Sequence, residues 1–292
     1  MNIKRHIRLL EFSVVVLSIL VFALPSYAES ESISILIEGL SGEQLKNAES
    51  ALKLPEDIIK DGTINMLWLR RFIRQIPQKV SSALEPFGYY KAETTATLDK
   101  KEEGAYTLLV KVVSGEPVRI SSISVLIDGP GESEEQIKAI LANLPFSNGD
   151  ILRQDKYEQL KNQIHDKAIE LGYLDADFST HLIDITLSSL SADIRLVFKT
   201  GPKFHFGDVN FIGAPIYPVR FLKRYLDFKP GEVFSYAKIA KTQYNLIGAD
   251  RFKEVTVNPK KEDAKDDKVP IEVRLVPSPT KRLRFGVGYG TD

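Results

Sequence analysis

The sequence predicts an α+β protein built from three tandem units, each with the order strand, helix, helix, strand, strand. Each unit is expected to form a three-stranded sheet with two helices on one face. Three observations predict this class. A turn pattern recurs at 84–98, 168–182 and 245–257, about 80 residues apart, as is typical of a domain array. Runs with apolar residues at every second position alternate with runs at helical spacing. A chain of 292 residues also accommodates two or three small cores.

The composition excludes several classes of function. The 39 basic and 39 acidic residues cancel, so no overall field favours nucleic acid and we expect no nucleic-acid partner. The sequence contains no cysteine, which removes disulfides, thiolate metal sites and thiol nucleophiles together.

Residues 1–28 are predicted to be an export signal. A basic start precedes the apolar run 12–24, and Ser26-Tyr27-Ala28 supplies the small residues that signal peptidase reads. We therefore expect cleavage between Ala28 and Glu29. The alternative is an uncleaved membrane anchor, but the run is shorter than the ~20 residues that cross a bilayer.

The first unit is expected at 29–116. Alternating isoleucines predict its first strand, and a long apolar stripe at helical spacing predicts its second helix, kinked or divided at Pro77. Two extended runs around a charged turn predict a hairpin. The expected strands are 33–37, 92–98 and 106–113, and the expected helices are 43–52 and 64–87.

The second and third units are expected at 117–201 and 202–278. In the second, Ser133 is predicted to cap the first helix, with Gln136 completing a capping box. In the third, Ser235 is the expected cap of the second helix. The expected strands are 123–127, 176–185, 194–198, 206–211, 253–257 and 269–276, and the expected helices are 133–144, 154–171, 219–226 and 236–247.

A turn follows the second helix of each unit, at Gly88, Gly172 and Asp250. Glycine adopts the left-handed conformation at such a position without steric cost, and Asp tolerates it better than most residues. Each turn is expected to lead the chain into the second strand of its unit, which after Gly88 and Gly172 is expected to form the open edge of the sheet.

Residues 279–292 do not resemble a fourth unit. Leu283, Phe285, Val287 and Tyr289 alternate with basic or small residues, a pattern typical of a membrane-barrel strand. A single strand cannot sit in a bilayer with unpaired edges. We expect these residues to begin an outer-membrane barrel that is truncated here, or else to pair elsewhere.

The sequence offers no convincing catalytic or metal-binding set. The histidines are scattered, and Glu262, Asp263, Asp266 and Asp267 lack the order of a calcium loop, so a solvated loop is expected. No nucleophile, base and orienting acid can be assembled. We predict that the protein is not an enzyme and binds no cofactor or metal.

Two surfaces are candidates for interactions. Arg70, Arg71 and Arg74 form a candidate partner-docking patch on the second helix of the first unit; the alternative is an ordinary solvated face. The second candidate is an open sheet edge, which accepts a further strand through main-chain hydrogen bonds, unless it is merely blunted. Its expected polar side chains are Glu93, Thr95, Thr97, Asp177, Ser179 and His181.

The order of the motifs resembles that of one family of outer-membrane proteins. These motifs are FGYY and LGYL at the turns, NLPFSNGD and DFKPGEVF in the middle of units, and RFGVGYGTD at 284–292. They are similar to the TamA family, the outer-membrane subunits of the translocation and assembly module, over essentially the whole mature chain. That family has three polypeptide-transport-associated (POTRA) domains before its barrel. One departure is Asp250-Arg251-Phe252, where the family usually has Gly-aromatic-Phe.

The resemblance implies a non-enzymatic factor on the periplasmic face of the outer membrane that assembles autotransporters and other barrel proteins. Its implied partners are an inner-membrane-anchored TamB-like subunit at the first domain, unfolded outer-membrane proteins, and the outer membrane through the barrel. Two readings from other classes stay open. One is a POTRA-like scaffold or division protein on an uncleaved anchor, and the other is a periplasmic hydrolase.

Overall fold

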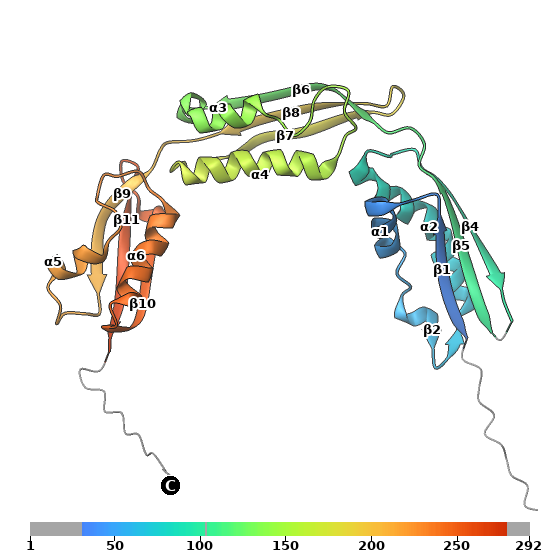
Figure 1. The fold of residues 1–292 in the computed structure, drawn as a ribbon, viewed down its shortest axis with the longest axis horizontal. Helices are drawn as coiled ribbons and strands as arrows, with labels where there is room; N and C mark the ends of the chain where they lie inside the picture. The colour runs from blue at the N-terminus through green and yellow to red at the C-terminus, as the bar shows by residue number, and fades with distance from the viewer. Residues whose placement is uncertain (1–30, 103, 279–292) are drawn as a thin grey trace, which may run out of the picture.

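A computed structural model describes residues 31–102 and 104–278. The predicted signal with its Ala28–Glu29 cleavage site, and the predicted barrel strand with Leu283, Phe285, Val287 and Tyr289, lie outside the described residues. Three α+β units follow one another in a row that bends into an arch, with α4 and α6 toward its inside (Figure 1). The predicted α+β class is confirmed.

The first unit has a three-stranded sheet in the order β1-β5-β4, with β1 parallel to β5 and β4 antiparallel to it. A small hairpin, β2 and β3, lies between the helices and was not predicted. The elements are β1 (Ser32–Glu38), α1 (Gly42–Ala51), β2 (Ile59–Lys60), β3 (Thr63–Ile64), α2 (Met66–Leu84), β4 (Glu93–Lys100) and β5 (Ala105–Val113).

Helix α2 is one continuous helix that runs through Pro77. The Asn65 side chain caps its start by accepting hydrogen bonds from the backbone N–H groups of Leu67 and Trp68 at 3.2 and 3.3 Å. Of the two alternatives predicted for Pro77, a kink or a division, the division is wrong, because the buried stripe continues on both sides of the proline and holds the helix on the sheet. That stripe consists of Leu69, Phe72, Ile76, Val80, Ala83 and Leu84.

The second unit repeats this topology in the order β6-β8-β7. The predicted cap at Ser133 is wrong: α3 begins two residues later, and the Ser133 hydroxyl instead donates to the Pro130 carbonyl at 2.9 Å within a short 3-10 turn. The elements are β6 (Arg119–Asp128), α3 (Glu135–Ala142), α4 (Gln154–Glu170), β7 (Asp177–Thr186) and β8 (Ser191–Lys199).

The third unit has the order β10-β11-β9. Phe206 stacks on Phe228 with ring centres 3.8 Å apart and lies 4.9 Å from Phe234, so aromatic rings fill much of its core. The elements are β9 (His205–Ile212), α5 (Val219–Leu222), α6 (Tyr236–Gly248), β10 (Phe252–Pro259) and β11 (Lys268–Pro277).

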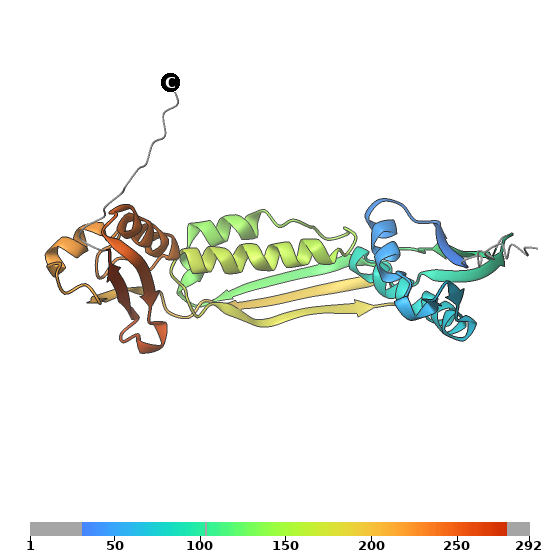
Figure 2. The same ribbon diagram turned by 90° about the horizontal axis from the view of Figure 1, so that it is seen from below.

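The helices of the second unit lie on one side of its sheet (Figure 2). Alternate residues of β8 and one stripe of α4 bury their side chains between the two layers, and each large apolar side chain buried in this way contributes about 1.5–3 kcal/mol. This layer is formed by Ala192, Ile194, Leu196 and Phe198 against Tyr157, Leu160, Ile164 and Ala168.

Among the described residues, no helix combines the length and the apolar character that a membrane span requires.

Candidate interaction surfaces

The repeated turns form the joints between units. The Gly88 carbonyl accepts a hydrogen bond from the N–H of Val118, the residue that leads into the next sheet, at 2.8 Å. The Gly172 carbonyl accepts one from the N–H of Phe204, also at 2.8 Å. Both glycines have positive φ, +86° and +93°. The same backbone hydrogen bond therefore joins the first unit to the second and the second to the third.

Two residues after each glycine, an apolar side chain enters the core of the following unit. Tyr90 packs against the core of the second unit, and Leu174 belongs to the core of the third. The residue between, Tyr89 or Tyr173, packs in the core of its own unit. We call Tyr90 and Leu174 the joint anchors. Sequence reasoning missed their role, although the repeated Gly-aromatic-apolar triplet was its visible signal.

The third turn does not follow this arrangement. Asp250 has φ +52° and keeps the left-handed turn, but Arg251 replaces the inward aromatic residue and is exposed. Phe252, at the anchor position, packs in the core of its own unit and lies 5.3 Å from the Tyr217 ring. The residue at the anchor position therefore packs in a following unit at the first two turns, but in its own unit at the third turn.

Side-chain contacts at the first joint centre on Arg153. Its guanidinium donates to the Glu43 carboxylate of the first unit at 2.9 Å and also bonds Asp155. The guanidinium carbon lies 5.3 Å from the centre of the Phe87 ring. The hydrogen bond from Arg153 lowers the pKa of the Asp155 carboxyl. The Arg153–Glu43 ion pair thus links the second unit to α1 of the first.

The second joint has two lysine contacts. Lys261, from the loop between β10 and β11, donates to the Leu174 carbonyl at 2.7 Å and pairs with Asp175. Lys203 pairs with Glu134, which also accepts a hydrogen bond from the Tyr173 hydroxyl at 2.8 Å. The loop 260–268 was predicted only to be solvated, and its Lys261 in fact connects two units.

The Glu134 cluster is electrostatically well satisfied. The hydrogen bond from Lys203 holds the pKa of the Glu134 carboxyl below its ordinary value, with a further contribution from the Tyr173 hydroxyl, although partial burial opposes both. Burial, and then the hydrogen bond to Glu134, raises the pKa of Tyr173 to about 12. The carboxylate stays charged and the phenol stays protonated across the physiological range.

The predicted edge strands β4 and β7 lie at sheet edges. Within 31–102 and 104–278, no backbone hydrogen bond joins β7 to any segment except β8. The ladder of β7 also contains a bulge between Phe178 and Thr180, a feature that discourages uncontrolled pairing of an edge. The exposed side chains on these strands include Glu93, Thr95, Thr97, Asp177, Ser179 and His181.

The opposite edges of the second and third sheets are partly covered. In the second unit, the Gly149 N–H donates to the Ile120 carbonyl of β6 at 2.7 Å. In the third unit, the Gly231 N–H donates to the Phe206 carbonyl of β9 at the same distance. The loops before α4 and α6 therefore block strand addition there, and no loop among the described residues covers β4 or β7 in this way.

The three predicted docking arginines lie on the solvent face of α2. Arg70, Arg71 and Arg74 are exposed around Leu67, whose side chain is 76 % exposed. The Arg71 guanidinium lies 5.5 Å from the centre of the Trp68 ring, which is 45 % exposed. Helix α2 contains no Asp or Glu, and these arginines form no ion pair with the described residues. The face is therefore basic and partly apolar.

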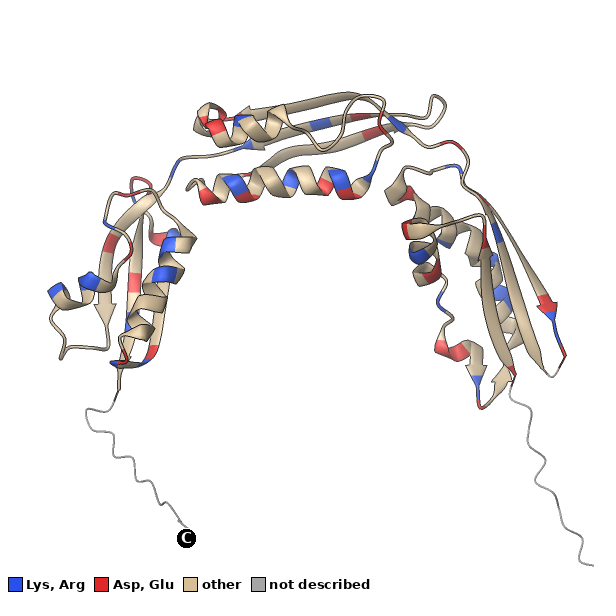
Figure 3. Ribbon diagram, in the orientation of Figure 1, with Lys and Arg blue, Asp and Glu red and all other residues tan. Residues whose placement is uncertain are grey.

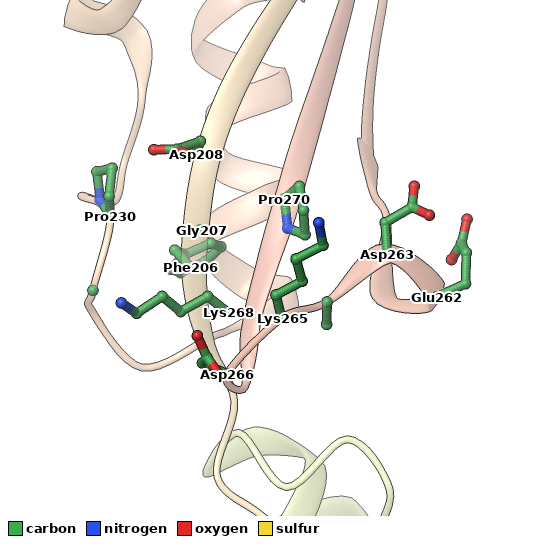
Figure 4. A pocket seen from close by; sticks show the side chains of 12 residues that line it. Phe206, Gly207, Asp208, Pro230, Glu262, Asp263, Lys265, Asp266, Lys268 and Pro270 are labelled. Carbon is green, nitrogen blue, oxygen red and sulfur yellow. The ribbon is translucent and has the colours of Figure 1, made fainter.

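One hollow of the third unit is lined by several charged side chains. This hollow, of about 890 Å³, lies at one end of the third sheet. Asp208 lies on one side of its strands, and Glu262 and Asp263 lie on the other (Figure 4). Within the described part of the chain, no three metal-ligating side chains gather at one point. The charged groups of this hollow thus do not converge on a common substrate position.

Comparison with known families identifies the outer two units. Residues 34–114 match the family model described as POTRA domain, TamA domain 1. Residues 204–278 match the POTRA model described as surface antigen variable number repeat. The first and third units are POTRA domains, and the second has the same topology and the same type of joint.

Several solved structures are similar to the chain. POTRA domains 3–5 of Haemophilus influenzae BamA have 17 % identity and a TM-score of 0.45, over 84 % of this chain and 95 % of that one. Haemophilus ducreyi BamA lacking POTRA domains 1–3 has 16 % identity and a TM-score of 0.42, over 55 % and 29 %. The N-terminal domain of Omp85 from Thermosynechococcus elongatus has 14 % identity and a TM-score of 0.34, over 86 % and 97 %. All three TM-scores are below 0.5, so the assignment of the units rests on the family models.

Proposed function

We propose that the chain is the periplasmic POTRA region of a factor that assembles autotransporters and other outer-membrane barrel proteins, and that it acts as a docking and guiding scaffold. Its partners are unfolded outer-membrane proteins and an inner-membrane-anchored TamB-like subunit. The outer membrane is reached through the barrel expected to begin at 279–292. The POTRA family matches support this class of protein, and the open edges of β4 and β7 support the mode of binding.

The observation that carries the proposal is the long free edge of β7. An unfolded barrel strand alternates apolar and polar residues and has every backbone N–H and C=O available. Adding it to β7 satisfies those groups without demanding a particular side-chain sequence. The exposed acid, hydroxyl and imidazole side chains of Asp177, Ser179 and His181 keep the edge soluble between binding events.

The proposed partner surface is the α2 face around Arg70, Arg71 and Arg74. These arginines and the neighbouring Leu67 and Trp68 combine charge with exposed apolar area, which favours a partner segment that carries acidic and apolar side chains. The first unit is at the far end of the arch from the chain's exit at Ser278 (Figure 1). Strand addition at β7 and partner binding at α2 would then occupy different units.

Strand addition is tested with a peptide of about ten residues that has the alternating pattern of a barrel strand. In hydrogen–deuterium exchange on the full chain, the peptide should protect amides in 177–186. A peptide of the same sequence, N-methylated at alternate residues on its binding edge, is the matched control. Equal binding of both peptides, or protection confined to the helices, would reject strand addition.

Partner docking is tested with the triple variant Arg70→Glu, Arg71→Glu, Arg74→Glu in the full chain. Retention of the TamB-like subunit should fall, while peptide protection of β7 should not change. The matched control reverses three exposed charges of the third unit, at Arg220, Lys223 and Arg224. If the control lowers retention as much as the α2 variant, the α2 face is not the docking surface.

A further inference from the structure

One end of the third unit gathers segments that are distant in sequence. Strands β9 and β11 are parallel, with Ile212 beside Arg274, so both strands finish at this end. A Cβ atom placed on Gly213 would lie only 2.3 Å from the Leu275 carbonyl oxygen, which shows how closely the two strand ends approach. The loop after β9, the helix α5 and the exit of the chain after β11 therefore share the end that points away from the second unit (Figure 1).

Aliphatic side chains project from this end. Ile216, in the loop before α5, is 63 % exposed, and Val219, at the start of α5, is 53 % exposed. Behind them Tyr217 and Phe221 are stacked with ring centres 5.6 Å apart. The half-buried rings support the loop, and the two aliphatic residues extend from it into solvent. Nothing in the described residues covers them.

The same segment is strongly basic. Residues 209–226 contain no Asp or Glu. Arg220, Lys223 and Arg224 are exposed and form no ion pair with any residue that the structure describes. The charged side chains of α5 and of the 3-10 turn that follows it are all basic (Figure 3).

Basic and acidic groups from the neighbouring elements also face this end. Arg251 lies with its guanidinium carbon 5.5 Å from the Phe221 ring centre. The acids here are Asp250, in the turn beside it, and Glu254, which lies 4.0 Å from Lys253. Asp227, which follows the segment, is already paired with Lys241 at 2.8 Å. The unpaired charge of the α5 segment is thus positive.

We propose that this basic end patch, formed by Ile216, Val219, Arg220, Lys223 and Arg224, binds the surface of an anionic phospholipid bilayer. Exposed aliphatic side chains gain free energy on entering the boundary between headgroups and acyl chains, and basic side chains near an anionic surface add to it. Long Arg and Lys side chains reach the headgroup phosphates from a short distance away.

The shape of the patch favours a membrane over a protein segment. Its apolar residues lie at the tip of a loop and at the start of a four-residue helix, where they project and do not line a groove. A projecting tip fits a deformable lipid surface. Binding would place the third unit with α5 and the end of β11 against the bilayer. This membrane contact goes beyond the scaffold function proposed above.

Vesicle sedimentation with the full chain tests the proposal. Vesicles of phosphatidylcholine with about one quarter phosphatidylglycerol should bind the wild-type protein more strongly than phosphatidylcholine alone. The variant Arg220→Glu, Lys223→Glu, Arg224→Glu should lose roughly a hundredfold in its partition coefficient, since each basic residue near the surface contributes several-fold. The matched control, Lys46→Glu, Lys53→Glu, Lys60→Glu, changes three exposed lysines of the first unit and should bind as the wild type does.

A local probe separates this patch from the chain ends. Every variant is identical outside its substituted positions, so any membrane affinity of the chain ends is common to all. Because the chain has no cysteine, Val219→Cys and Leu67→Cys can each carry a polarity-sensitive fluorophore at a single site. The emission of the label at position 219 should shift to the blue on anionic vesicles, and that at position 67 should not.

Several outcomes would overturn the proposal. They include equal binding to both kinds of vesicle, equal loss of binding by the two triple variants, and no emission shift at position 219. An acidic protein that binds the patch while anionic vesicles do not would likewise replace the membrane by a protein partner. None of these results depends on strand addition at β7, so the two proposals can fail separately.

Discussion

The peptide oxygen of Gly172 accepts a hydrogen bond from the peptide N–H of Phe204 at 2.8 Å, across the boundary between two units. Two residues later, Leu174 enters the core of the third unit. A turn that ends a helix in one unit therefore also begins the packing of the next. The arch is built by this repeated joint, and its geometry decides how far apart the edge strands and the α2 face are held.

The joint predicts that Gly172→Ala is more destabilising than the same change at an open turn. Gly172 has φ +93°, and an added Cβ would lie 2.7 Å from Val233 and 3.2 Å from the Phe204 carbonyl. Gly231 has a similar φ, +87°, but a Cβ added there would meet no neighbouring atom within 4 Å. We expect a loss of about 2–3 kcal/mol in the free energy of unfolding for Gly172→Ala and about 1 kcal/mol for Gly231→Ala. Urea unfolding measures both, and equal losses would show that the close contacts at the joint do not matter.

The joint anchor Leu174 predicts thermodynamic coupling between two units. Leu174 follows the turn of the second unit in sequence, but its side chain lies in the core of the third unit, and the residue is only 8 % exposed. Leu174→Ala should cost about 2–4 kcal/mol through lost burial and a residual cavity, and the third unit should lose stability. Residue-level hydrogen exchange locates the effect. Leu160→Ala, wholly within the core of the second unit, is the control; faster exchange confined to the second unit in both variants would contradict the coupling.

Much of the fold follows from local patterns, whereas the joints depend on three-dimensional neighbours. The stripe on α4 and the alternation on β8 each indicate their own buried face, because periodicity records which side of an element avoids water. Nothing in the spacing of Lys261 or Arg153 indicates a partner about a hundred residues away. The same applies to Pro77, where a local rule predicts a break that the buried face on both sides overrides.

Both interaction surfaces were partly visible in the sequence. The arginines of α2 lie within five residues of one another in the chain, but the exposure of Leu67 beside them depends on how the helix rests on its sheet. The polar alternation of β7 predicts a solvent-facing strand, but a bulge at Ser179 and the absence of a covering loop are results of tertiary structure. The basic end patch depends on parallel strands whose finishing ends meet.

The Glu134 cluster predicts a defined dependence of stability on pH. The pKa of Glu134 is lower in the folded state than its ordinary value of 4.5. The charged carboxylate therefore contributes its full stabilisation at pH above 4.5, and this stabilisation is lost as the pH falls through the lower pKa of the folded state. Glu134→Gln should remove about 1–2 kcal/mol at pH 7 and progressively less in acid. The test is the difference in the free energy of unfolding between the wild type and Glu134→Gln, measured between pH 3 and pH 7. A difference that stays constant over this range would contradict the assignment.

The contact between Arg153 and Glu43 predicts control of an angle more than of stability. The Arg153 side chain is 35 % exposed and that of Glu43 is 72 % exposed, so solvent screens the pair and its coupling energy should be only about 0.5 kcal/mol. The pair nevertheless ties α1 to the start of α4, and losing it should widen the distribution of distances between the first two units. Spin labels on cysteines introduced at exposed positions, Thr97 and Asp166, would report this distance in a chain that has no other cysteine.

Arg153→Met and Glu43→Gln should broaden the distribution to a similar extent, and the double variant should add little to either, since each change removes the same contact. High salt should broaden the wild type but not the variants. Lys156→Met, which removes a nearby charge from α4 that forms no ion pair in the described residues, should leave the distribution unchanged; an equal effect there would show that overall charge, and not this contact, sets the angle.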